Sequence, residues 1–145
     1  MAKLLLVDDD SLLVRMYQTK LEGEGHQVET ADNGLAMFEK LGEYKPDLVL
    51  LDVMMPQMNG LEALTKLKNT PSLKSIPVIM LTNVGSSEED SRQALELGAV
   101  SYLVKSDYTP KEVVQKVKEI LKGYTRELPQ VKTIIKPAQV TVENL

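Results

Sequence analysis

Short apolar runs alternate with longer amphipathic stretches along this chain. The candidate strands lie at residues 3–7, 28–31, 48–51, 77–81 and 100–104, and their lengths are typical of β-strands. The stretches between them repeat apolar residues at helical spacing, as Leu13, Tyr17 and Leu21 do. The pattern therefore predicts five strand–helix units in succession.

Capping signals mark where the predicted helices begin and end. Asp10 or Ser11 is expected to cap the first helix. Three capping boxes pair Asn59 with Glu62, Ser86 with Glu89, and Thr109 with Glu112. The ends of the helices are expected near Gly23, Gly42, Lys68 and Gly98. Strand–helix units at this spacing require right-handed crossovers, so we expect an α/β, flavodoxin-like (βα)5 doubly wound parallel sheet in the order 2-1-3-4-5.

The chain has 145 residues, enough for one domain with its own core. From residue 123 onward the helical period is lost, two prolines appear, and residues 131–135 and 140–142 are rich in β-branched side chains. We therefore expect residues 1–122 to form the domain. Residues 123–145 are interpreted as a C-terminal extension and not as a second domain.

Composition excludes several kinds of chemistry. The chain has no cysteine, and its single histidine, His26, cannot form a histidine metal cluster. No apolar run exceeds four residues, too short for a signal peptide or a membrane span, so a cytoplasmic protein without a membrane segment is expected. The net charge of −4 argues against direct nucleic-acid binding, which requires a basic surface.

Polar side chains follow four of the predicted strands. Asp8 and Asp9 follow the first strand, Asp52 the third, Thr82 the fourth and Lys105 the fifth. Because the carboxyl ends of parallel strands meet at one edge of a sheet, these groups are expected to converge. An acid beside as much apolar surface as Asp52 is costly unless other groups pair with it.

This set of groups suits the acceptance of a phosphoryl group. Asp52 would be the nucleophile and would form an acyl phosphate. Carboxylate oxygens favour a hard cation, so Mg²⁺ is expected on Asp9 and Asp52, with Asp8 acting through water. Lys105 and Thr82 would contact the remaining phosphoryl oxygens.

The four strand ends together resemble the receiver domain of bacterial two-component response regulators, of the single-domain, chemotaxis-regulator type, over residues 1–122. The resemblance implies that Asp52 is the phosphoacceptor, supplied by a sensor histidine kinase or a phosphotransfer protein. It implies Mg²⁺ on Asp8, Asp9 and Asp52 and on the main-chain carbonyl of Met54. The domain would be a signalling phosphoacceptor, not an enzyme.

The resemblance also implies a switch and shows one departure. Thr82 and Tyr102 would form the switch, with the tyrosine turning inward when the threonine moves toward the phosphoryl group. The family commonly has proline after the lysine in a cis bond, whereas Ser106 follows Lys105 here. Either this peptide is trans and the loop is shifted, or the fold offsets a cis cost of about 2.5–4 kcal/mol.

Two other functions remain open. A covalent aspartyl-phosphate phosphohydrolase would carry a second acid two residues after Asp52, but Met54 stands there. A receiver-like scaffold that is not phosphorylated is the other alternative.

Output is expected through protein binding, to a downstream partner or to a second copy of the chain, because the extension is too short for a DNA-binding domain. Lys111, Gln115, Lys118 and Lys122 recur on one face of the last helix, either as a docking stripe or as a solvated face. The sequence does not identify the kinase, the partner or the pathway.

Overall fold

The computed structural model describes residues 2–82 and 88–123. The strands are β1 (Lys3–Val7), β2 (Gln27–Ala31), β3 (Leu48–Leu51), β4 (Val78–Thr82) and β5 (Ser101–Val104). The helices are α1 (Ser11–Gly23), α2 (Gly34–Leu41), α3 (Gly60–Lys68), α4 (Glu88–Glu96) and α5 (Pro110–Leu121), with a short 3₁₀ helix η1 (Lys105–Asp107). The expected box of Ser86 with Glu89 and the extension from residue 124 lie outside the described residues.

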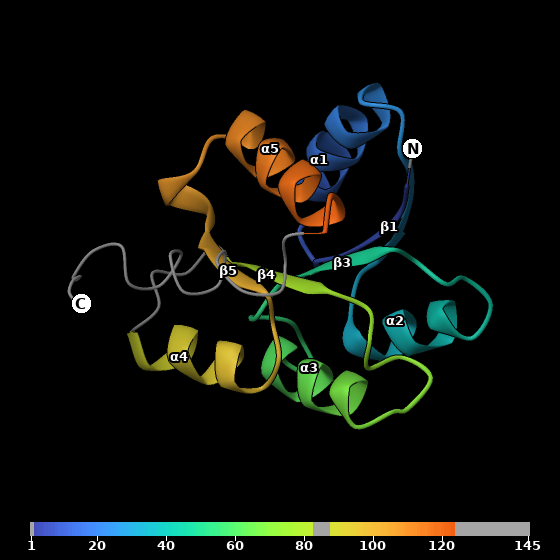
Figure 1. The fold of residues 1–145 in the computed structure, drawn as a ribbon, viewed down its shortest axis with the longest axis vertical. Coiled ribbons are helices and arrows are strands. Elements are labelled where there is room, and N and C mark those ends of the chain that lie inside the picture. Colours follow the sequence, from blue (N-terminus) through green and yellow to red (C-terminus); the bar gives the residue numbers. More distant parts are fainter. Residues whose placement is uncertain (1, 83–87, 124–145) are drawn as a thin grey trace.

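The strands form one parallel sheet in the order β2-β1-β3-β4-β5, which confirms the predicted fold (Figure 1). Val7 of β1 is level with Leu51 of β3, so Asp8 and Asp52 leave the sheet side by side. Thr82 of β4 is level with Val104 of β5, and Lys105 follows directly. The register therefore brings the four strand ends to one edge.

Helices cover both faces of the sheet, with α1 and α5 on one side and α2, α3 and α4 on the other (Figure 1). Successive side chains of a strand point to opposite faces. Leu4 and Leu6 accordingly join the core under α1 and α5, whereas Leu5 and Val7 join the core under α2, α3 and α4. Burial on both faces explains why β1 and β3 appear in the sequence as continuous apolar runs.

The helix starts agree with the capping signals. Asp10 caps α1, because its side chain accepts hydrogen bonds from the backbone N–H groups of Leu12 and Leu13. The capping boxes at α3 and α5 are both formed. These caps fix where each helix begins relative to the strand before it, and so fix the loops at the carboxyl edge of the sheet.

The loop after β5 shows whether the peptide bond between Lys105 and Ser106 is cis or trans. No peptide bond of the described residues is cis, so the trans alternative holds. The chain forms η1 directly after β5, an element that the sequence pattern did not predict. Within residues 2–82 and 88–123, no helix has both the length and the apolar character needed to span a membrane.

Candidate functional site

Three carboxylates meet at the carboxyl edge of the sheet. Asp8 and Asp9 follow β1, and Asp52 follows β3. One carboxylate oxygen from each lies within 4.8 Å of the others. Asp8 and Asp52 are each 5% exposed, whereas Asp9 faces solvent. The cluster predicted from the strand ends is therefore present, and it opens to solvent on the side of Asp9.

Asp8 is held by two donors. The Lys105 Nζ lies 2.5 Å from Asp8 Oδ2, and the backbone N–H of Asp10 donates to Asp8 Oδ1 at 2.9 Å. The Lys105 side chain is only 7% exposed. The Lys105 ammonium, at the end of β5, thus extends to β1 and neutralises the charge of the Asp8 carboxylate. A buried charge is costly without such a partner.

Asp52 is less well satisfied. Its backbone N–H donates to the carbonyl of Val7 at 3.0 Å, but its Oδ1 is buried and accepts no hydrogen bond within the described residues. Burial and then the charge of Asp8 raise the pKa of Asp52 to about 6, against the opposing effects of Lys105 and of the Met54 and Val53 backbone N–H groups. A buried oxygen of this kind is an acceptor without its donor.

Two further predicted residues lie on the strands beyond Asp52. Thr82 is 1% exposed, and its Oγ1 also has no hydrogen-bond partner among the described residues. Tyr102 lies on β5, level with Met80, and belongs to the core beneath α4. In this structure the tyrosine is turned inward, which is one of the two positions that the switch hypothesis requires.

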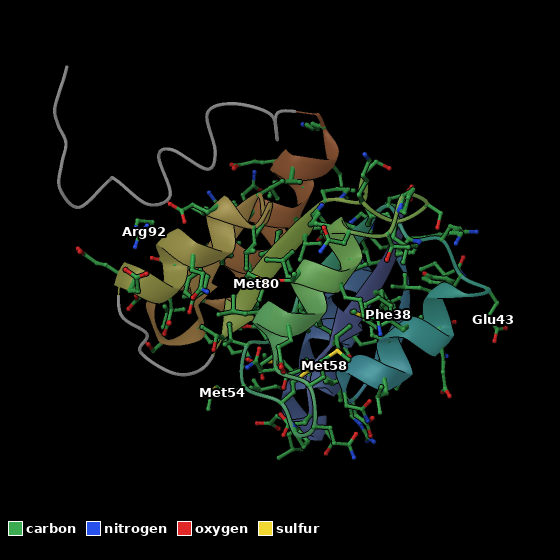
Figure 2. The ribbon with its side chains drawn as sticks, turned by 90° about the horizontal axis from the view of Figure 1, so that it is seen from below. Phe38, Glu43, Met54, Met58, Met80 and Arg92 are labelled. Carbon is green, nitrogen blue, oxygen red and sulfur yellow. The ribbon has the colours of Figure 1, made fainter. Side chains whose placement is uncertain are left out.

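The donor set fits a small, hard cation. Three carboxylates supply oxygen ligands within reach of one ion, and a single ammonium does not balance them. Mg²⁺ prefers such oxygen donors. The side chain of Met54 is exposed and points away from the fold (Figure 2), so this residue has only its main chain to offer a cation.

A groove of about 650 Å³ adjoins the cluster. Its lining includes Asp8 and Asp9, Arg15 of α1, Thr30 of β2 and Lys40 of α2. The groove therefore follows the outer edge of β2 between α1 and α2. It leaves the Asp9 side of the cluster accessible from outside the domain.

The sequence model of the response regulator receiver domain matches residues 4–118. The chain belongs to this family. A CpxR homologue from Haemophilus influenzae, described as a transcriptional regulatory protein, is 47% identical over 123 residues, covering 84% of this chain and 51% of that protein. PhoP of Bacillus subtilis, the alkaline phosphatase synthesis regulator, is 39% identical over 120 residues, covering 83% and 48%. This receiver chain spans about half the length of these relatives.

Solved receiver structures agree with the fold. The chemotaxis response regulator CheY4 of Vibrio cholerae superposes with a TM-score of 0.75 at 31% identity, covering 83% of this chain and 98% of that one. The Mn²⁺-bound form of the response regulator Rcp1 gives a TM-score of 0.71 at 30% identity, covering 88% and 97%. The metal in the second structure belongs to that protein.

Sequence reasoning missed two contacts of this receiver site. It assigned Lys105 to a phosphoryl group and did not predict its pairing with Asp8. It expected Asp10 to cap a helix and to add a carboxylate near Asp8, but it did not predict that the Asp10 backbone N–H donates to Asp8. The run of three acids after β1 was the only available signal, because pairing across the sheet depends on side-chain reach.

Proposed function

We propose that this receiver accepts a phosphoryl group on Asp52 from a histidine kinase or a phosphotransfer protein and thereby changes its affinity for a protein partner. The observation that carries the proposal is the Asp52 carboxylate, buried with one oxygen unpaired beside two other acids. Such a group is costly to maintain in a fold. Its cost is explained if a cation and a phosphoryl group complete the site.

Mg²⁺ would be held by Asp9, by Asp52, by Asp8 through water, and by the main-chain carbonyl of Met54. When bound, it would supply positive charge that offsets the charge of the transferring phosphoryl group. The carboxylate cluster fits this role. The chemistry itself depends on what the chain's own residues do.

Asp52 acts as the nucleophile. One of its oxygens bonds to phosphorus while the bond from phosphorus to the donor histidine nitrogen breaks, and that nitrogen leaves with the electron pair. The product is an acyl phosphate. Lys105 then exchanges its contact with Asp8 for a phosphoryl oxygen, and the Thr82 hydroxyl donates to another. Lys105 already reaches Asp8 across the edge of the sheet, and Thr82 is level with Val104, the residue before Lys105.

The two alternatives are less well supported. A phosphohydrolase needs a general acid to protonate its leaving group, but Met54 has no proton to give and its side chain points to solvent (Figure 2). A scaffold that is not phosphorylated has no use for a buried unpaired carboxylate. We therefore assign no enzymatic activity beyond self-catalysed phosphotransfer and dephosphorylation.

The proposal extends to the organisation of the chain. Residues 1–122 would be the receiver and residues 123–145 an extension that influences output. The protein would work in the cytoplasm, where histidine kinases hold their phosphoryl groups. The segment that matches this chain makes up about half of each relative named as a transcriptional regulator. We propose that the receiver acts on a protein partner or on a second copy of the chain.

Acetyl phosphate with Mg²⁺ tests the assignment directly. We expect the intact mass of the protein to increase by one phosphoryl group, and Asp52→Asn to abolish the increase while leaving the far-UV circular dichroism unchanged. Asp47→Asn is the matched control, because Asp47 lies at the opposite edge of the sheet, where its side chain accepts a hydrogen bond from the Lys3 backbone N–H. An acyl phosphate that still forms in Asp52→Asn would refute the assignment.

A further inference from the structure

The loop that leaves Asp52 closes directly onto the start of α3. Gly60 is the first residue of that helix and is buried. Its backbone N–H donates to the carbonyl of Val53 at 2.7 Å. The hydrogen bond joins the two ends of the loop, and the Met54 main chain lies within the segment that it closes.

The contact at Gly60 leaves no space for a side chain. A Cβ atom there would lie 2.8 Å from Val53 Cα and 2.9 Å from the Asp52 carbonyl carbon, and closer still to the Asp52 carbonyl oxygen. All three are main-chain atoms, so no rotation of a side chain can relieve the clash. A substitution at Gly60 must therefore move either the helix or the Asp52–Val53 peptide.

Two other glycines show that this crowding is specific. At Gly34, the first residue of α2, an added Cβ would meet the Met58 side chain, with 2.8 Å to its Sδ. Met58 lies beside α2 in Figure 2, and a flexible side chain of this kind can turn away. At Gly23, at the end of α1, an added Cβ would meet nothing within 4 Å.

The main chain of Asp52 is thus fixed from two sides. Its N–H donates to Val7 of the neighbouring strand, and its carbonyl group abuts Gly60. The position of the peptide between Asp52 and Val53 determines where the Asp52 carboxylate and the Met54 carbonyl point. The atoms proposed to hold Mg²⁺ therefore depend on how closely α3 approaches the sheet.

We propose that Gly60 is a positioning residue for the Mg²⁺ and phosphoryl site. Because it carries no side chain, the N-terminus of α3 can pack closely against the Asp52–Val53 peptide. This close packing sets the positions of the groups that would bind the cation. The capping box of Asn59 and Glu62 holds the same helix start in place. The inference rests on the proposed function, because it concerns the same site.

Gly60→Ala and Gly23→Ala form a matched pair for the test. Mg²⁺ binding to the full chain is measured by isothermal titration calorimetry, and folding by urea denaturation. We expect Gly60→Ala to bind Mg²⁺ roughly 10- to 100-fold more weakly than the wild type, as losses of supporting contacts around metal sites do. Gly23→Ala should bind as the wild type does. A folded Gly60→Ala protein with wild-type Mg²⁺ affinity would overturn the inference.

A second pair of variants decides the question if Gly60→Ala does not fold. Glu62→Ala and Glu112→Ala each remove one capping box, at α3 and at α5, without adding an atom. We expect Glu62→Ala to weaken Mg²⁺ binding and Glu112→Ala to leave it unchanged. Equal Mg²⁺ affinities in the two variants would refute the role of α3 packing against the Asp52–Val53 peptide.

The wild-type protein separates this inference from the proposed function. If acetyl phosphate labels the wild type at Asp52 and labels Gly60→Ala equally fast at the same free Mg²⁺, only the positioning role fails. If the wild type neither binds Mg²⁺ nor takes up a phosphoryl group, the proposed function fails first.

Discussion

Single residues of the site are arranged at a cost to stability, and Asp52 shows this most clearly. Its pKa is about 6 in the fold, against an ordinary value of 3.8, because burial and Asp8 disfavour its ionised form. The folded state therefore holds this proton more tightly than the unfolded chain does. The contribution of Asp52 to the free energy of unfolding therefore decreases as the pH rises from 3.8 to about 6 and stays lower at higher pH.

Asp52→Asn should remove this cost. In metal-free buffer at pH 8, we expect the variant to be more stable than the wild type by up to about 3 kcal/mol, the free energy that corresponds to the pKa shift. At pH 4 the difference should nearly disappear, because the wild-type carboxyl is then protonated in the fold. Urea denaturation at pH 4 and at pH 8 measures the difference in the free energy of unfolding between the variant and the wild type. The same stability difference at pH 4 and pH 8 would contradict the explanation.

Met54 is expected to affect a different property, the lifetime of the acyl phosphate. Its side chain is 58% exposed, and it stands two residues after Asp52. A thioether cannot orient a water molecule for attack, whereas an amide can. Val84, which the sequence places in the equivalent position after Thr82, lies outside the described residues.

We therefore expect slow self-dephosphorylation in the wild type and faster loss of phosphate in Met54→Asn. The decay of the phosphorylated protein is followed by intact mass after the phosphodonor is removed. Met54→Leu is the control, since it keeps an apolar side chain of similar size and should keep the wild-type half-life. An unchanged half-life in Met54→Asn would show that this position does not govern access of water.

Among the elements, the sequence was sufficient wherever the signal was local. Apolar runs such as 48–51 identify strands buried on both faces. The pairs Asn59 with Glu62 and Thr109 with Glu112 identify helix starts, because a capping box needs only residues three positions apart. The order of the sheet followed from the rules of parallel connections and is confirmed.

The sequence was insufficient where a contact joins elements that are distant along the chain. Lys105 and Asp8 are 97 residues apart, and their pairing depends on side-chain reach. The close approach of Gly60 to Asp52 depends on how α3 seats against the sheet. Neither leaves a periodic or local signal, so only the three-dimensional arrangement shows them.

For the whole molecule, charge is distributed unevenly around the edge strand β5. This strand lies between α4 on one face of the sheet and α5 on the other (Figure 1). The first turn of α4 is acidic, with Glu88 and Glu89 exposed. The predicted stripe on α5 is exposed along its length and carries Lys111, Lys118 and Lys122. The acidic turn and the basic stripe thus belong to helices that flank β5 from opposite faces of the sheet.

The opposite charges of α4 and α5 could pair between two copies of the chain. In a twofold-symmetric pair, α4 of one copy can face α5 of the other, so that opposite charges meet twice. Tyr102 lies on β5 between the two helices and packs in the core beneath α4. A shift of Thr82 toward a phosphoryl group would change the packing around Tyr102 beneath α4. Phosphorylation of Asp52 would in this way affect the contact between α4 and α5 of two copies.

We therefore expect phosphorylation to strengthen self-association through the α4 and α5 surfaces, with a coupling of about 1–3 kcal/mol. Sedimentation velocity of the full chain, with and without acetyl phosphate and Mg²⁺, measures it. Lys111→Glu, at the start of α5, should weaken association, as should Glu88→Lys, because each places like charges together. A mixture of the two variants should restore association. In the mixed pair, one contact keeps its wild-type charges and the other has both charges reversed, so both contacts are attractive. A mixture that associates no better than either variant alone would exclude this pairing.

The C-terminal extension, residues 123–145, belongs to the same prediction, because it continues the chain from the end of α5. Its residues 131–135 and 140–142 favour extended structure, and an added strand is one way in which such a segment can enlarge an interface. Deletion of residues 125–145 should change the dimerisation constant of the phosphorylated protein and leave the rate of labelling by acetyl phosphate unchanged, because Asp52 and its partners all lie before residue 106. If the truncated and full chains sediment identically in both phosphorylation states and bind partners equally, the extension has no part in output, and the α4 and α5 surfaces must account for it alone.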